Sequence, residues 1–139
     1  MRTNLFRSLV TAIMILICMF LNWNSFSQYK KSTLQKWKGI ASYYHPKFNG
    51  RKTSNGEIFS NTKLTCANNF LKLGTYIKVL NPKNGKSVVV KVNDRMSKHN
   101  RRLVDLSQAA AKELGLLHKG LGEVSIEVMD KGYRTLALN

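Results

Sequence analysis

Asp94 is the carboxylate whose setting in the sequence most favours proton-transfer chemistry. It ends the segment 87–94 (SVVVKVND), in which alternate side chains share a face, so three valines lie on the same side as Asp94. A carboxyl group at the end of an apolar row loses hydration, which favours its protonated form, and a protonated carboxyl is a general acid. The alternative is a turn residue that hydrogen-bonds to nearby backbone or pairs with Arg95.

Two other acids stand at informative positions. Glu57 follows the turn dipeptide Asn55-Gly56 and is the first acid in the chain. Taken by itself, it is interpreted as a surface carboxylate in weak ion pairs with the many lysines. Asp105 lies between apolar residues just ahead of a predicted helix. We interpret it as structural, holding the helix N-terminus by hydrogen bonds and dipole attraction.

Cys66 suggests a nucleophile with a histidine as its base. Its small and apolar neighbours favour the alternative, a buried residue, because free cysteine is among the most buried residue types. The histidines are scattered along the chain and form no cluster with cysteine, so neither a metal nor a cofactor is expected. These histidines are His45, His99 and His118.

The elements that must position these side chains are short strands separated by turns. Strands are predicted over 39–44, 75–80, 87–94 and 123–129, with a hairpin connection at 81–86. One helix is predicted over 108–114, between a Ser107 cap and a Gly115 stop. Tyr43 and Tyr44 face opposite ways on the first strand, so one enters the core and the other is free to stack on a sugar ring. The pattern predicts a β-rich domain with one or two short helices, most simply a closed barrel.

The N-terminal segment has the features of a secretory signal peptide. Arg2 and Arg7 flank a polar start, and the apolar run over 8–21 is shorter than the roughly 20 residues of a membrane-spanning helix. Small residues two apart predict cleavage after Ser27; the alternative is a retained membrane anchor. The expected division is a signal peptide at 1–27, a basic flexible arm at 28–38, a barrel at 39–130 and a C-terminal tail at 131–139.

Composition narrows the class of partner. The chain has 139 residues, with 23 Lys+Arg against 7 Asp+Glu and a net charge of +16. One domain is expected at this length, and 43% hydrophobic residues argue against disorder. Removing residues 1–27 takes away two arginines and Cys18, which leaves a charge of +14 and a single thiol without a disulfide partner. A basic protein secreted across the inner membrane is expected in the periplasm or cell envelope, with wall glycan and anionic envelope polymers as partners rather than nucleic acid.

Several stretches, in order and with matching spacing, resemble the rare lipoprotein A (RlpA) family. The resemblance covers about residues 39–129. The matching stretches are Gly39–Tyr44, Phe48–Glu57, Leu64–Ala67, Leu73–Thr75, Val88–Arg95, Val104–Ser107 and Ala109–Ala111.

The resemblance implies a six-stranded double-psi β-barrel, as in expansins and some lytic transglycosylases. It implies an endolytic peptidoglycan lytic transglycosylase that cleaves the MurNAc–GlcNAc bond and leaves 1,6-anhydro-MurNAc ends. Glycan poor in stem peptides is the expected substrate, and wall remodelling or daughter-cell separation at the septal ring the expected role. The protein is expected to be a monomer without a cofactor.

The resemblance also assigns residues. Asp94 matches the acid that protonates the glycosidic oxygen, and Glu57 matches a second, supporting catalytic carboxylate. The substrate groove is predicted to contain Tyr44, Asn68, Asn93 and Arg95. Asn68 stands where the family usually has a histidine, and an amide can hydrogen-bond a sugar hydroxyl but cannot shuttle a proton. A second hypothesis therefore stays open: a non-catalytic, expansin-like module that binds wall glycan.

Overall fold

The computed structural model describes residues 13–14 and 35–129. The chain divides into two compact units, 1–33 and 34–139, and everything below concerns the second. The signal peptide, apart from helical residues 13–14, and the tail at 131–139 lie outside the described residues and stay predictions. Within the described part of the chain, no helix is both long and apolar enough to cross a membrane.

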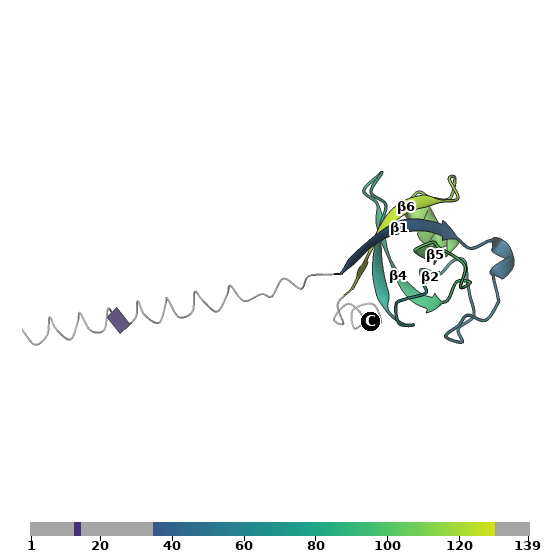
Figure 1. Ribbon diagram of the computed structural model, residues 1–139, viewed down its shortest axis with the longest axis horizontal. Coiled ribbons are helices and arrows are strands. Elements are labelled where there is room, and N and C mark those ends of the chain that lie inside the picture. The colour runs from purple at the N-terminus through teal and green to yellow at the C-terminus, as the bar shows by residue number, and fades with distance from the viewer. Residues whose placement is uncertain (1–12, 15–34, 130–139) are drawn as a thin grey trace, which may run out of the picture. The chain divides into compact units, whose positions relative to one another are not determined.

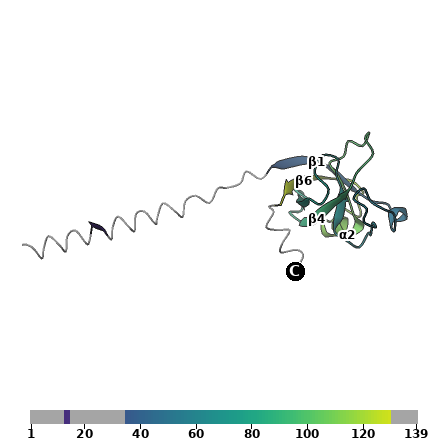
Figure 2. The same cartoon turned by 90° about the horizontal axis from the view of Figure 1, so that it is seen from below.

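Six strands close into a barrel in the order β1-β5-β2-β4-β3-β6 (Figures 1 and 2). The pairs β1–β5 and β2–β4 are parallel, and the other four pairs are antiparallel. This architecture confirms the expected mainly-β, six-stranded barrel. The strands are β1 (Lys36–Tyr43), β2 (Thr65–Ala67), β3 (Tyr76–Leu80), β4 (Ser87–Asp94), β5 (Val104–Leu106) and β6 (Gly122–Val128).

The hairpin β3–β4 forms because its sequence satisfies both strands and turn. Val79 lies opposite Val88 in register, and Gly85 has a φ of 71°, a conformation that glycine adopts without steric cost. Along β4 the valines alternate inward, which is the pattern predicted for 87–94. This strand therefore carries Asp94 to a fixed place at its C-terminal end.

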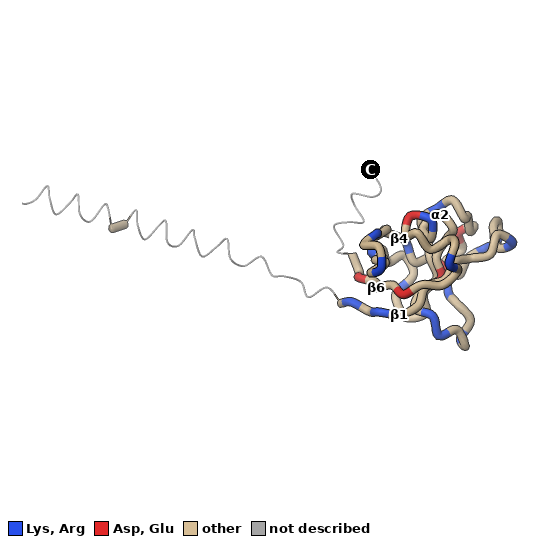
Figure 3. Tube along the Cα trace, turned by 90° about the horizontal axis from the view of Figure 1, so that it is seen from above, with Lys and Arg blue, Asp and Glu red and all other residues tan. Residues whose placement is uncertain are grey.

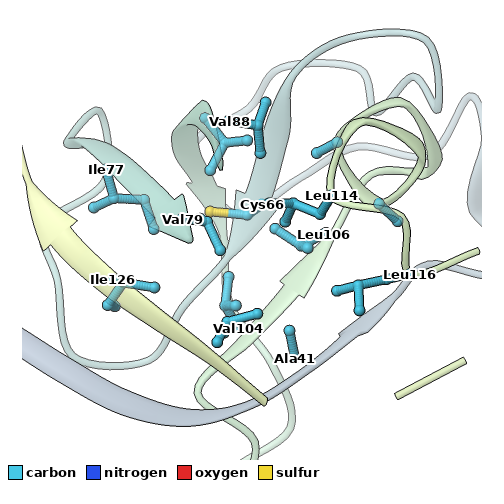
Figure 4. Close-up of a cluster of buried hydrophobic side chains, with 14 of the residues drawn as sticks. Ala41, Cys66, Ile77, Val79, Val88, Val104, Leu106, Leu114, Leu116 and Ile126 are labelled. Carbon is cyan, nitrogen blue, oxygen red and sulfur yellow. The ribbon is translucent and has the colours of Figure 1, made fainter. Parts of the chain in front are cut away.

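The barrel interior is a closed apolar core. Side chains from all six strands and from the helix α2 (Gln108–Glu113) meet there (Figure 4). Burying a valine, leucine or isoleucine side chain fully contributes about 1.5–3 kcal/mol. The fully buried members with the largest side chains include Ile77, Val79, Val90, Val92, Val104, Leu106, Leu114, Val124 and Ile126.

Two short helices complete the described fold. In α2 the Ser107 hydroxyl accepts from the Ala110 amide at 3.3 Å, and Gly115 follows with a φ of 70°, so both predicted helix ends are confirmed. The 3-10 helix η2 (Pro46–Phe48) begins the connection that follows β1.

Three strands differ from the predictions. β1 begins at Lys36 rather than at residue 39, so residues 36–38 belong to the barrel and not to a flexible arm. Trp37 stabilises this start by packing on Phe70, with ring centroids 5.3 Å apart. β2 and β5 were not predicted as strands, because three residues each are too few to show an alternating pattern.

Candidate functional site

A groove of about 630 Å³ lies between the connections that follow β1 and β4. Small-molecule and cofactor sites commonly have volumes of this order. The loops that form it lie beside the arrowhead of β1 in Figure 1. Residues from the end of β1, the end of β4, the loop after β4 and β5 meet in it. Those that the following paragraphs use are Tyr43, Tyr44, Phe48, Phe59, Asp94, Arg95, Arg102 and Asp105.

Asp94 is the carboxylate at the centre of the hydrogen bonding in this groove. Its Oδ1 accepts from the Ser54 amide at 2.9 Å, the Ser54 hydroxyl at 2.6 Å and the Arg95 amide at 2.8 Å. Among the described residues, its Oδ2 accepts from the Tyr44 hydroxyl alone, at 2.8 Å. Oδ1 is therefore saturated with donors, whereas Oδ2 keeps accepting capacity for a further proton.

These donors decide the ionisation of Asp94. Burial raises its pKa, but the hydrogen bonds from Ser54, Tyr44 and Arg95 together outweigh burial and leave the pKa below its usual value. The prediction that partial burial favours a protonated Asp94 is therefore wrong, since donors to the charged form stabilise the carboxylate. Burial and the bond to Asp94 raise the pKa of Tyr44, so its hydroxyl stays protonated.

Ser54 is a site residue that the sequence did not single out. It lies in a turn in which the Gly56 amide donates to the Thr53 carbonyl at 2.9 Å and the Thr53 amide to the Glu57 carbonyl at 2.8 Å. The Asn55 amide donates to the Asn93 carbonyl at 3.1 Å, which fastens the turn to β4. The dipeptide Asn55-Gly56 indicates a turn in the sequence. It does not indicate that Ser54 in this turn contacts Asp94, because the two residues are 40 positions apart.

Glu57 lies on the same turn but outside the lining of the groove. Its side chain pairs with Lys91 and accepts from the Asn93 amide group at 3.2 Å. The bond to Lys91 chiefly lowers the pKa of Glu57, with further bonds from Asn93 and Asn55. The two predicted catalytic acids are thus linked through adjacent residues of β4, yet only Asp94 lines the groove.

Two of the four predicted groove residues are buried instead. Asn93 is 2% exposed and Asn68 is fully buried. The Asn68 side chain donates to the Leu103 carbonyl at 2.9 Å and accepts from the Phe70 and Leu71 amides at 3.0 and 2.7 Å. Asn68 thus spends its polar atoms on backbone groups inside the protein, and the buried Asn93 donates to Glu57. Neither residue lines the groove, so the placement of Asn68 and Asn93 in it is corrected.

The other two predicted groove residues, Tyr44 and Arg95, do line it. The Tyr44 ring lies 4.4 Å from Phe59 and 5.8 Å from Phe48, centroid to centroid, which gives the groove an aromatic surface. The Arg95 guanidinium donates to the Asn68 carbonyl. Tyr43 packs against the core and its hydroxyl donates to the Leu117 carbonyl at 2.8 Å, in line with the expected opposite orientations of the tyrosines.

Asp105 does not hold the helix N-terminus, as the sequence suggested. Arg102 binds it through Nε at 2.8 Å and Nη2 at 3.0 Å, and Ser42 and Asn100 donate to it as well. Ser107 caps α2 instead, and Asn61 accepts from the Gln108 and Ala109 amides at the same helix end. The difference arises because β5 turns Asp105 toward the loop after β4, where it lines the groove.

Cys66 is 1% exposed, and burial raises the pKa of its thiol, which confirms the predicted buried role and leaves no thiolate nucleophile. Among the described residues, no group of three or more His, Cys, Asp or Glu side chains is placed to hold a metal ion.

The closed mixed barrel with an acid-bearing groove defines the class of this protein, the double-psi β-barrel domains. A family model described as lytic transglycolase matches residues 36–126, and the chain belongs to that family. This confirms the resemblance found in the sequence.

Curated relatives carry the name endolytic peptidoglycan transglycosylase RlpA. The Haemophilus influenzae protein is 46% identical over 92 residues, which are 66% of this chain and 32% of that protein. The Vibrio cholerae protein is 48% identical over 91 residues, 66% of this chain and 35% of that protein. The chain thus spans about a third of the length of these relatives.

Solved structures with the same fold are more distant. A Streptomyces papain inhibitor matches with a TM-score of 0.58 and 22% identity, over 70% of this chain and 98% of that one. A Clavibacter michiganensis expansin mutant in complex with cellohexaose matches with a TM-score of 0.57 and 20% identity, over 69% of this chain and 51% of that one. At this identity the likeness concerns the fold alone.

Proposed function

We propose that this domain cleaves the glycan strands of peptidoglycan as a lytic transglycosylase, a carbon–oxygen lyase. The observation that carries the proposal is Asp94, a carboxylate in the groove with one saturated oxygen and one oxygen free to exchange a proton. Membership of the lytic transglycolase family and the names of the curated relatives support the same reaction.

The reaction needs only one proton to be moved. The bond from C1 of MurNAc to the bridging oxygen breaks, and the C6 hydroxyl oxygen of the same sugar bonds to C1. The hydroxyl proton ends on the released GlcNAc oxygen, which leaves a 1,6-anhydro-MurNAc end. Because neither water nor a net proton is consumed, Oδ2 of Asp94 can take the proton from the C6 hydroxyl and deliver it to the leaving oxygen.

The direction of the pKa shift favours this order of transfer. In the free protein Asp94 is ionised at neutral pH, because its hydrogen bonds lower its pKa. It therefore starts as a base. A glycan in the groove displaces water from the carboxylate, and this desolvation raises the affinity of Asp94 for the proton that it then returns. Tyr44 keeps its proton and holds Oδ2 in place throughout.

Glu57 acts in this proposal as a positioning residue. Its side chain ties the 53–57 turn to Lys91 and Asn93 of β4, and its carbonyl accepts from Thr53 within the turn. That turn presents Ser54 to Asp94. Glu57→Gln keeps an oxygen that accepts these bonds, so it is expected to retain most activity with an unchanged pH profile, whereas Glu57→Ala loses activity. Equal inactivation of both variants would instead assign the charge of Glu57 to the reaction.

The half-buried rings of Tyr44 and Phe48, packed on buried Phe59, offer a surface on which a sugar ring can stack, and Arg95 supplies a donor beside Asp94. A monomer is proposed to act on glycan poor in stem peptides, in the periplasm or cell envelope after secretion. Wall remodelling or daughter-cell separation at the septal ring is the proposed role. Lys and Arg recur along the described part of the trace (Figure 3), and this excess of positive charge fits attraction to anionic envelope polymers.

The reaction is tested by digesting purified sacculi with the full chain and identifying the soluble products by mass spectrometry. Fragments that end in 1,6-anhydro-MurNAc are expected. Fragments that end in reducing MurNAc would show hydrolysis and overturn the lyase assignment. Salt-sensitive binding of sacculi without any released product would support the rival hypothesis of an expansin-like binding module.

A further inference from the structure

A second hollow, of about 620 Å³, adjoins the groove, and we call it the side hollow. Its volume is of the order found for small-molecule sites. Ser97, Asn100 and Arg102 line both the groove and the side hollow. A chain of sugars bound in the groove therefore has a neighbouring space for its next unit, and the proton transfer at Asp94 makes no use of this space.

Arg102 gives the side hollow a hydrogen-bond donor in a fixed position. Its Nε and Nη2 donate to the two oxygens of Asp105, at 2.8 and 3.0 Å. The Asn100 side chain donates to Asp105 at 3.3 Å and accepts from the Arg102 amide at 3.0 Å, which also fixes this part of the loop. The Arg102 side chain is 40% exposed, and within the described part of the chain its Nη1 has no hydrogen-bond partner. Nη1 is therefore a preorganised donor that a ligand can reach.

The ion pair decides which acceptor suits this donor. Asp105 offsets the charge of Arg102, so the fixed pair does not attract an anion. Arg101, the other arginine in the lining, is exposed, and no ion pair engages it within the described residues. Water and salt screen its charge, although it still disfavours a ligand with an ammonium group. The acceptor that fits Nη1 is thus a neutral oxygen.

The side hollow also has an apolar wall. Ile40 is 40% exposed and Leu121 is 54% exposed, and both line it. Glu123 pairs with Ile40 across the β1–β6 ladder, and Leu121 lies two residues before Glu123. Ile40 and Leu121 are therefore diagonal neighbours on one face of the sheet. A methyl group bound there removes apolar surface from water.

A fixed donor beside an apolar wall matches an acetamido group, in which a neutral carbonyl oxygen adjoins a methyl group. From this match, and resting on the proposed function, we propose that the side hollow binds the N-acetyl group of a sugar in the glycan strand. The carbonyl oxygen accepts from Nη1 of Arg102, and the methyl group packs on Ile40 and Leu121. Asp105 is a positioning residue, because it holds Arg102 in place.

This assignment gives the domain a specificity for N-acetylated glycan. A sugar with a hydroxyl group in place of the acetamido group lacks the methyl group and cannot extend an oxygen as far toward Nη1. A sugar with a free amino group lacks both features, and its ammonium charge is repelled by Arg101. The expected order of binding is therefore N-acetylated glycan first, hydroxyl-bearing glycan second and amino-bearing glycan last.

Binding is measured by calorimetry with the Asp94→Asn variant of the full chain, which is not expected to cleave its ligand, after circular dichroism has shown that it is folded. The probes are chitotetraose and cellotetraose, two neutral tetrasaccharides that differ in having an acetamido or a hydroxyl group on each sugar. We expect chitotetraose to bind about tenfold more tightly, because a hydrogen bond from a charged donor and a buried methyl group together provide a factor of this order.

Variants in the same background locate the preference. Arg102→Gln and Leu121→Ser are each expected to reduce it to about threefold. Their matched controls, Lys98→Gln on the same loop and Leu64→Ser at another exposed leucine, lie outside both linings and leave the preference unchanged. Asp105→Asn has the effect of Arg102→Gln, and combining the two adds no further loss, because Asp105 acts through Arg102. A general loss of structure would instead weaken binding of both probes alike.

Three results would overturn the inference: equal binding of the two probes, no measurable binding of chitotetraose, or a loss of preference in the control variants as large as in Arg102→Gln and Leu121→Ser. A parallel digestion of sacculi by the wild-type chain separates this inference from the proposed function. A preference for chitotetraose without released products would refute the lyase alone, and 1,6-anhydro products without that preference would refute the N-acetyl site alone.

Discussion

Replacing Asn68 with alanine tests whether this residue supports the structure rather than contacting a ligand. Asn68 is fully buried and serves three backbone groups, the carbonyl of Leu103 and the amides of Phe70 and Leu71. Alanine removes all three partners, and a buried polar group left unpaired costs about 1–3 kcal/mol. Because Phe70 is exposed, its amide regains water, so the expected loss in the free energy of unfolding is about 2–4 kcal/mol.

The assay is urea unfolding of the full chain, with Asn69→Ala as the matched control. A loss of about 3 kcal/mol lowers the urea midpoint by about 1–3 M at an unchanged slope. Asn69 is exposed; it accepts from the Met96 amide at 2.8 Å and donates to the Ser97 carbonyl at 3.4 Å, so its replacement costs less than about 1 kcal/mol. Equal destabilisation by the two variants would refute the reasoning, since it would mean that burial of Asn68 adds nothing.

Three further outcomes follow from the described contacts. Ser54→Ala removes a donor to ionised Asp94, so the pKa of Asp94 rises and the ascending limb of the kcat/KM profile moves to higher pH; an unmoved limb would contradict its assignment to Asp94. Cys66, buried with a raised thiol pKa, is expected to resist iodoacetamide until urea unfolds the chain, as peptide mapping would show; rapid native labelling would contradict its burial. Asn68→His is expected not to increase the yield of anhydro products in the sacculus assay, because this position lies outside the groove; a gain would show that it reaches the substrate.

Much of the fold is predictable because its longer elements carry strong local patterns. The alternating valines of β4, the turn at Gly85 and the Ser107 cap of α2 each specify local structure without reference to the rest of the chain. β2 and β5 carry no such pattern, because three residues show no period and their neighbours in the barrel determine their conformation. The early start of β1 at Lys36 depends on pairing with β6, a contact far away in the sequence.

The site was less predictable, for a related reason. The alternating pattern of β4 predicted that Asp94 points inward with the valines. In the structure, the pairing of β2 with β4 shifts register between Cys66 and Ala67, opposite the end of β4. At this end of the strand Asp94 contacts the 53–57 turn instead. Its ionisation depends on Ser54, Tyr44 and Arg95, and only Arg95 is near it in the sequence. Likewise, Asn68 carries no sequence signal that separates a buried amide from one that meets a ligand.

The measurement that bears most directly on the proposed reaction is a comparison of Asp94→Asn with the wild-type chain on purified sacculi. The amide of asparagine cannot accept the C6 hydroxyl proton, although it can still pair with Ser54 and Tyr44. We predict that release of 1,6-anhydro-MurNAc products falls by about 10²–10⁴-fold, with folding and sacculus binding retained. Wild-type product release by a folded Asp94→Asn variant would contradict the assignment of proton transfer to Asp94.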